Sequence, residues 1–76
     1  MEEKEKEDLE AMKTAVLRQK ELFFDIVRDI ERASAEDLKN MGYGSMTKTD
    51  AILTAYSHAS KRVQKLTADY VKKYPD

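Results

Sequence analysis

The 76-residue chain has no cysteine, which excludes a disulfide framework and a zinc site built on thiolates. It has one histidine, two glycines and one proline, so few positions can interrupt a helix, and no glycine-rich phosphate loop follows a strand. Its uninterrupted apolar runs are at most three residues long, whereas a membrane span needs about 20 mostly apolar residues. These observations predict one small helical domain, or a fragment of a larger one, without a membrane segment.

Neither sign of charge dominates the chain, because 14 basic residues stand against 15 acidic ones. Such balanced charge suits solvated helix surfaces better than a surface built to enclose nucleic acid. The balance differs along the chain: residues 1–40 contain 12 acidic and 8 basic residues, and residues 41–76 contain 3 and 6. The two halves therefore attract each other, either within one chain or between chains.

The first ten residues, MEEKEKEDLE, lack the apolar segment of a secretory signal. Their acidity also argues against a mitochondrial transit peptide. A cytoplasmic location is expected.

Apolar residues recur in two segments at alternating steps of three and four, which places them along one side of an α-helix. The only glycines, Gly42 and Gly44, lie between the two segments. The pattern predicts an all-α fold, namely a two-helix antiparallel hairpin with a short intervening helix, assembled into a helical oligomer.

The predicted bounds follow from this pattern and from local signals. Residues 1–8 form a charged N-terminal extension, which can prolong the first helix but which we expect to fray. Residues 9–76 form a single hairpin domain with a first helix over 9–33, a short helix over 35–41 and a last helix over 48–73.

Capping signals mark the helix ends. Ser34 and Asp37 have the spacing of a capping box at the start of the short helix. Gly42 suits the C-terminal cap, because glycine adopts the left-handed conformation at little cost. Thr47 begins a second capping box before the last helix, with Thr49 as an alternative N-cap.

The first helix is apolar over an arc too wide for one neighbour. Leu17, Phe24 and Val27 are rotated away from the main stripe, so the helix needs packing partners on two sides. A hairpin this small rarely gains more than about 3–5 kcal/mol from its own core. We therefore predict a homo-oligomer whose core and interface consist of Leu9, Met12, Val16, Leu17, Phe23, Phe24, Ile26, Val27, Ile30, Ile52, Tyr56, Ala59, Val63, Leu66 and Tyr70.

Two alternatives stay open at this stage. Leu38 and Met41 of the short helix can fold back over Phe24 and Val27, which would remove the need for a second chain there. Gln19 occupies a core position of the heptad, where a polar residue can fix register or oligomeric state at a cost in stability. Gln19 can also lie at a hydrated part of the seam.

No constellation of catalytic residues is present in the sequence. The one histidine, His58, lies on the polar side of the last helix, where a surface role is the simplest interpretation. Acidic residues are plentiful, but none has a metal-binding spacing with a histidine. We therefore predict a non-enzymatic protein with no catalytic residue, no metal site and no cofactor.

A basic stripe follows helical spacing on the face of the last helix opposite Tyr56, Val63 and Leu66. It can contact nucleic-acid phosphates, or it can be a solvated face that pairs with acids of the first helix. The second interpretation is favoured, because no arginine alternates with exposed aromatic residues for base recognition. The candidate nucleic-acid contact residues of this stripe, which also includes His58, are Lys61, Arg62, Lys65 and Lys72.

A long helix, a short capped break and the segment TDAILTAYSHASK at 49–61 give this chain a layout that resembles the central oligomerisation hairpin of some phage small terminase subunits. The resemblance spans about residues 15–72. It implies a ring-forming, phage DNA-packaging adaptor that helps to recognise viral DNA for the large packaging motor. That family has an N-terminal helix-turn-helix, where this chain has a charged decapeptide, so direct site recognition is in doubt.

The sequence thus supports three functional hypotheses. The first is a self-associating helical module that organises a larger complex. The second is an adaptor that binds the nucleic-acid backbone through the basic stripe. The third is a small helical inhibitor that inserts an apolar stripe into a groove of a partner protein. The number of subunits, and whether the hairpin closes within one chain or is swapped between two, stay open.

Overall fold

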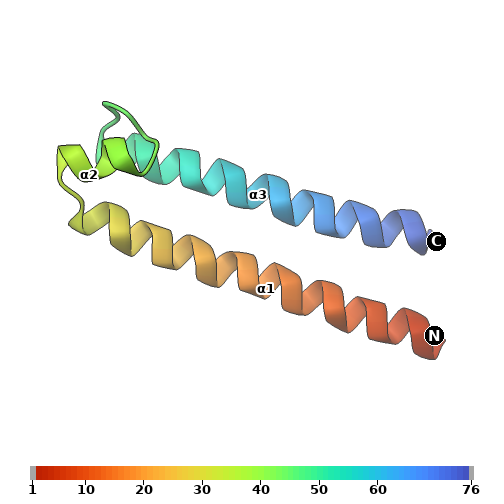
Figure 1. The fold of residues 1–76 in the computed structure, drawn as a ribbon. Coiled ribbons are helices and arrows are strands. Elements are labelled where there is room, and N and C mark those ends of the chain that lie inside the picture. Colours follow the sequence, from red (N-terminus) through yellow and green to blue (C-terminus); the bar gives the residue numbers. More distant parts are fainter. Residues whose placement is uncertain (1, 76) are drawn as a thin grey trace.

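The computed structural model describes residues 2–75, which form three helices: α1 (Glu3–Arg32), α2 (Ala35–Asn40) and α3 (Lys48–Lys73). Helices α1 and α3 run side by side and antiparallel, with both chain ends at one end and α2 at the other (Figure 1). The predicted all-α hairpin with a short intervening helix is confirmed. Met1 and Asp76, the outer limits of the predicted extension and hairpin domain, lie outside the described residues.

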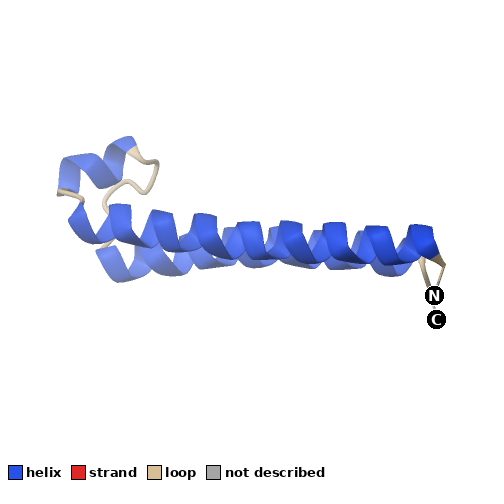
Figure 2. Ribbon diagram, turned by 90° about the horizontal axis from the view of Figure 1, so that it is seen from below, coloured by secondary structure: helices blue, strands red, loops and turns tan. Residues whose placement is uncertain are grey.

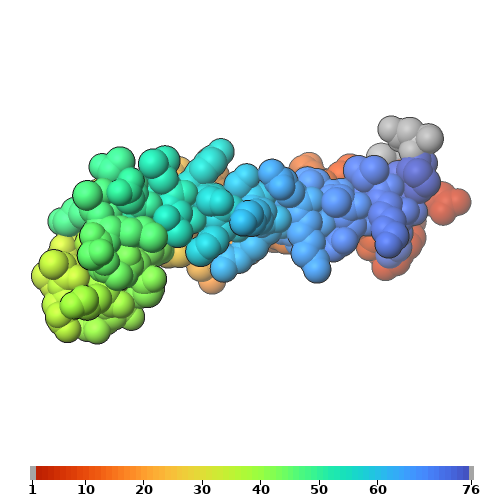
Figure 3. All heavy atoms as spheres, turned by 90° about the horizontal axis from the view of Figure 1, so that it is seen from above, coloured from red at the N-terminus to blue at the C-terminus, as the bar shows by residue number. Residues whose placement is uncertain are grey.

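The hairpin is a thin rod with a lobe at its loop end (Figure 3). Its principal extents are 51 × 17 × 16 Å. Its accessible surface is 5869 Å², whereas a compact monomer of this mass exposes about 4,800 Å². A single chain in this shape therefore leaves much more surface in water than a globular protein of equal size.

Helix α1 begins at Glu3, six residues before the predicted start, so the segment expected to fray is helical. Glu3 and Glu5 lie in its first turn, where acidic groups interact favourably with the helix dipole. Asp8 also bonds to the far end of α3. Sequence spacing alone does not reveal this long-range contact.

The chain leaves α1 through one extended residue and enters α2 at a capping box. Ala33 has φ −74° and ψ 142°, which ends the helix. The Ser34 hydroxyl accepts a hydrogen bond from the Asp37 amide, and the Asp37 carboxylate accepts one from the Ser34 amide, each at 3.1 Å. These bonds hold the pKa of Asp37 below its ordinary value, chiefly through the Ser34 amide. The predicted capping box is confirmed.

Helix α2 ends in a Schellman turn around Gly42. The Tyr43 amide bonds to the carbonyl of Leu38 at 2.9 Å, and the Gly42 amide to that of Lys39 at 3.0 Å. This turn requires the left-handed conformation at Gly42, which has φ 95°. The turn brings the Tyr43 side chain against the core beside Leu38. Gly42 thus has the terminating role expected from the sequence.

Helix α3 has the predicted bounds. The Thr47 hydroxyl accepts a hydrogen bond from the Asp50 amide at 3.1 Å, so Thr47 rather than Thr49 is the N-cap. The Lys48 ammonium donates to the carbonyl of Glu31 at 2.6 Å, which ties the start of α3 to the end of α1.

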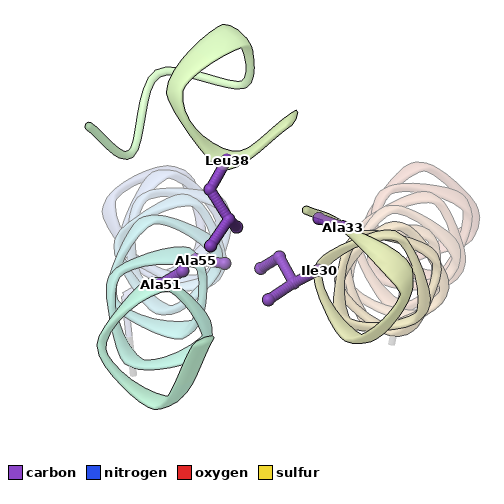
Figure 4. Packing of buried hydrophobic residues seen from close by; sticks show 5 residues of the cluster. All are labelled: Ile30, Ala33, Leu38, Ala51 and Ala55. Atoms are coloured by element: carbon purple, nitrogen blue, oxygen red, sulfur yellow. The ribbon is translucent and has the colours of Figure 1, made fainter. Parts of the chain in front are cut away.

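The buried core is confined to the loop end of the hairpin. Ile30 and Ala33 approach Ala51 and Ala55 across the two long helices, and Leu38 of α2 closes the cluster from one side (Figure 4). Ile30 is fully buried and is the largest side chain in this state. Towards the open end, none of the described side chains of α1 and α3 is buried. The rest of the seam is therefore only half covered within one chain.

The buried side of α3 passes through Ala51 and Ala55, whereas the sequence pattern placed it through Tyr56. Ala55 is 4% exposed and Tyr56 is 59% exposed. The small alanines allow Leu38 and Ile30 to approach α3 closely. Within a single chain Tyr56 is thus a surface residue, and its predicted interface role needs a partner beyond this chain.

Helix α2 lies to one side of the plane of the two long helices, as the edge-on view shows (Figure 2). It covers Ala51, and Tyr56 is five residues further on, about 140° around the helix. Phe24 remains 51% exposed and Met41 38% exposed. The alternative in which Leu38 and Met41 cover Phe24 is therefore wrong.

Candidate interaction surface

An apolar groove of about 400 Å³ runs between α1 and α3 on the side away from α2. The half-buried Val16, Phe23, Ala59 and Val63 form its floor, because they lie nearest the seam. The groove is lined by Val16, Gln19, Lys20, Phe23, Phe24, Tyr56, Ala59, Ser60, Val63 and Gln64. Six of these ten belong to the interface predicted from the sequence.

Three aromatic rings cluster at the loop-end side of the groove. The ring of Phe23 meets Tyr56 edge-on, with centroids 5.7 Å apart and planes at 72°. Phe24 lies 6.0 Å from Phe23, and the Lys20 ammonium lies 5.8 Å from the Phe24 ring centre. Phe24 and Tyr56 stand on opposite rims, each more than half exposed. An aromatic pair at an edge-on angle is favourable, but here it faces water.

The groove rims continue along the hairpin at heptad spacing. Leu17 lies seven residues before Phe24, and Leu53 lies seven residues before Ser60. Val71 lies seven residues after Gln64. Side chains seven residues apart share one side of a helix. We call this side of the hairpin the groove face; Leu17, Phe24, Leu53, Tyr56 and Val71 on it each expose more than half of their surface.

Sequence reasoning missed Leu53 and Val71 as interface residues. The signal for them is their heptad distance from Ser60 and Gln64, which line the groove and are themselves polar. A search for apolar stripes alone cannot find a rim whose middle positions are polar.

The other predicted interface residues lie along the seam itself. Ile30 is buried, as described above, while the following are half-buried between α1 and α3 or beside them: Leu9, Met12, Val16, Phe23, Ile26, Val27, Ile52, Ala59, Val63, Leu66 and Tyr70. The predicted set thus divides into an intrachain seam and three exposed members of the groove face, Leu17, Phe24 and Tyr56.

Gln19 lies in the seam, as its heptad position suggested. It lines the groove on one side and a smaller hollow beside Arg62 and Lys65 on the other. Its Oε1 atom is buried and accepts no hydrogen bond from any residue that the structure describes. A buried acceptor without a donor costs about 1–3 kcal/mol, so this position weakens the middle of the hairpin.

The basic stripe faces away from the groove. Lys65, nine residues after Tyr56, points half a turn away from it. Lys61, Arg62, Lys65 and Lys72 form no ion pair with α1 among residues 2–75. The expectation that these cations pair with acids of the first helix is therefore wrong. The acids of α1 instead pair mostly with cations of α1 itself.

One cluster joins the acidic and basic halves, at the open end. Asp8 lies 2.8 Å from the Lys73 ammonium and 3.3 Å from that of Lys4. It also accepts a 2.5 Å hydrogen bond from the Tyr74 hydroxyl. We call Asp8, Lys73 and Tyr74 the end clasp.

The clasp shifts the titration of both of its acidic groups. Lys73, followed by Tyr74 and Lys4, holds the pKa of Asp8 well below its ordinary value of 3.8. The Asp8 carboxylate in turn raises the pKa of Tyr74 from 10.0 to about 12. The clasp holds the start of α1 against the end of α3. The opposite charges of the two halves were the one sign of it in the sequence.

Within residues 2–75 no group of three His, Asp or Glu side chains lies close enough to hold a metal ion. His58 is exposed on α3. No described helix is long and apolar enough to cross a membrane. No protein-family profile matches the sequence, and neither a curated protein nor a solved structure was found to be similar to it.

Proposed function

We propose that the chain is a non-enzymatic helical self-assembly module that organises a larger complex in the cytoplasm. The observation that supports it is the position of the exposed apolar side chains of α1 and α3, which gather on the groove face (Leu17, Phe24, Leu53, Tyr56 and Val71). Exposed apolar patches of this kind mark interaction sites. The core of the single chain is confined to one end, so association is the available route to burying the rest.

The test is the mass in solution, measured by light scattering over a wide range of protein concentration. Self-assembly predicts a mass of two or more times 8.8 kDa, in whole multiples. Phe24→Glu should return it to one copy while the helical circular dichroism persists. Ala11→Glu adds the same charge at an exposed position about 140° away on α1 and should stay assembled. A wild-type chain that is a monomer throughout would contradict the proposal.

A second candidate is an adaptor for nucleic acid, as in DNA packaging by small terminase-like proteins. The observation that favours it is that the basic stripe has no ion pair with α1 among the described residues, so its charges are available to phosphates. Binding to duplex DNA that weakens steeply with salt would support this candidate. Binding that is absent at low salt would exclude it.

A further inference from the structure

We propose that the groove face binds a second copy of this chain, with the two hairpins parallel and their loop ends together. A twofold axis along the rod then places α1 of each copy on α3 of the other, which makes a closed four-helix bundle. The inference rests on the proposed self-assembly and specifies its partner and geometry.

The groove face is self-complementary, as a twofold interface must be. Phe24 projects from one rim and Tyr56 from the other at a similar height along the rod, so a parallel twofold partner sets Phe24 of each copy against Tyr56 of the other. One copy thus supplies both halves of the contact.

The available area suits a dimer. Each hairpin alone exposes 5869 Å², about 1,000 Å² more than the about 4,800 Å² of a compact chain of its mass. A stable interface buries about 800 Å² per partner, so one such interface would remove most of this excess.

The direction of the partner follows from the charges beside the groove. Contacts such as Phe23 with Tyr56 and Lys48 with Glu31 set the register of α1 against α3, and this register places Lys20 opposite Ser60. Among residues 2–75, Lys20 is the one charged residue that lines the groove.

Two twofold arrangements centred on the groove can be compared. With the hairpins antiparallel, α1 lies on α1, and Lys20 of one copy meets Lys20 of the other, which is repulsive. With the hairpins parallel, Lys20 meets Ser60 of the second copy, a neutral side chain that accepts a hydrogen bond. In the same arrangement Phe24 of one copy meets Tyr56 of the other, so both exposed rings become buried. The parallel arrangement is therefore the favoured one.

Disulfide trapping tests this geometry cleanly, because the chain has no cysteine. Lys20→Cys and Ser60→Cys are made as separate full-length chains and oxidised briefly, alone and mixed. A disulfide needs Cα atoms within about 7 Å, and positions on diagonal helices of a four-helix bundle are further apart. The mixed pair should therefore form at least about tenfold faster than either self-pair, since only its thiols have a high effective concentration.

A second pair, Lys13→Cys with Thr67→Cys, lies one heptad along the same rims and repeats the test if the first pair disturbs the fold. Lys65→Cys, on the side of the basic stripe, is the matched control and should remain uncoupled. Fast self-pairing of Ser60→Cys, which retains Lys20, would overturn the parallel arrangement, because the antiparallel one places α3 on α3 and brings the two copies of position 60 together. A wild-type mass above two copies, or of two copies without the mixed disulfide, would overturn this inference and leave self-assembly standing. A wild-type chain that is monomeric would contradict both this inference and the proposed self-assembly.

Discussion

The hydroxyl of Tyr74 donates a 2.5 Å hydrogen bond to the carboxylate of Asp8, although 66 positions separate the two residues. Lys73 approaches the same carboxylate oxygen at 2.8 Å. Asp8 lies in the charged segment at the start of α1, and Tyr74 directly follows α3. The contact holds the start of α1 against the end of α3.

The clasp predicts a defined pH dependence of stability. Because the pKa of Asp8 is lowered on folding, its contribution is complete above about pH 4 and is lost as the pH falls below the ordinary value of 3.8. Because the pKa of Tyr74 is raised to about 12, its contribution is complete below pH 10.0 and is lost as the pH rises towards 12. Between these two pH limits, the contribution of the clasp to the stability of the hairpin should not depend on pH.

Asp8→Asn checks the acid side of this window. The variant should melt at a lower temperature than the wild type at pH 7, and the difference should narrow as the pH falls from 4 to 2. Asp25→Asn is the control, because the Asp25 carboxylate pairs with Arg28 of the same helix, α1, and bonds to no described residue of α3. Equal melting temperatures of Asp8→Asn and the wild type at pH 7 would show that the clasp contributes nothing.

Ile30→Ala should be among the most destabilising apolar truncations in the chain. Its side chain is fully buried at the centre of the core cluster, and such a truncation costs about 2–5 kcal/mol because a cavity remains. Urea unfolding at fixed protein concentration measures the loss. Leu22→Ala removes similar atoms from a half-buried position on the same helix, and it should cost less than half as much. A similar cost at both positions would argue against a core confined to the loop end.

Local chemistry made the helices and their caps predictable. Ser34, Gly42 and Thr47 act where their residue types indicate, because capping depends on groups a few residues apart. The rotation of α3 was not predictable in this way. Tyr56 outranks Ala55 in apolar area, yet Ala55 is buried because Leu38 and Ile30 require a small neighbour, and that requirement comes from another element.

The groove face was predictable only in part, because its position also depends on how separate elements pack together. Leu17 and Phe24 were identified because they do not fit the single seam of the first helix. Tyr56 was assigned to the seam of the last helix, and it is exposed on the groove face instead. Leu53 and Val71 were missed because their rim is interrupted by Ser60 and Gln64.

Gln19→Leu should stabilise the chain. The substitution removes a buried acceptor that has no donor among the described residues and replaces it with an apolar group, a gain of about 1 kcal/mol or more. Thermal melting measures the gain, and light scattering shows whether the number of subunits changes, as it does when a polar core residue specifies the assembly. No rise in melting temperature would indicate that water or a partner chain satisfies Gln19.

Changing Lys61, Arg62 and Lys65 together to Gln should leave the melting temperature nearly unchanged, because these cations have no ion pair with α1 to lose in residues 2–75. If the stripe binds nucleic acid, the triple variant should lose duplex DNA binding. Each lost phosphate contact should also reduce the logarithmic salt slope by about 0.9. Titration of labelled DNA at several salt concentrations gives both quantities. A marked fall in the melting temperature would instead support the interpretation that the basic stripe forms ion pairs with α1.

The position of the core next to the loop also sets an order of folding. Ile30 and Ala51 close a loop of about 20 residues, and closing the 66-residue separation of Asp8 and Tyr74 directly would cost about 1 kcal/mol more in chain entropy. Folding should therefore begin with the contacts around α2, and the pairing of α1 with α3 should then extend towards the open end of the hairpin. Substitutions near Ala51 are then expected to slow folding, and substitutions at Asp8 or Tyr74 to accelerate unfolding.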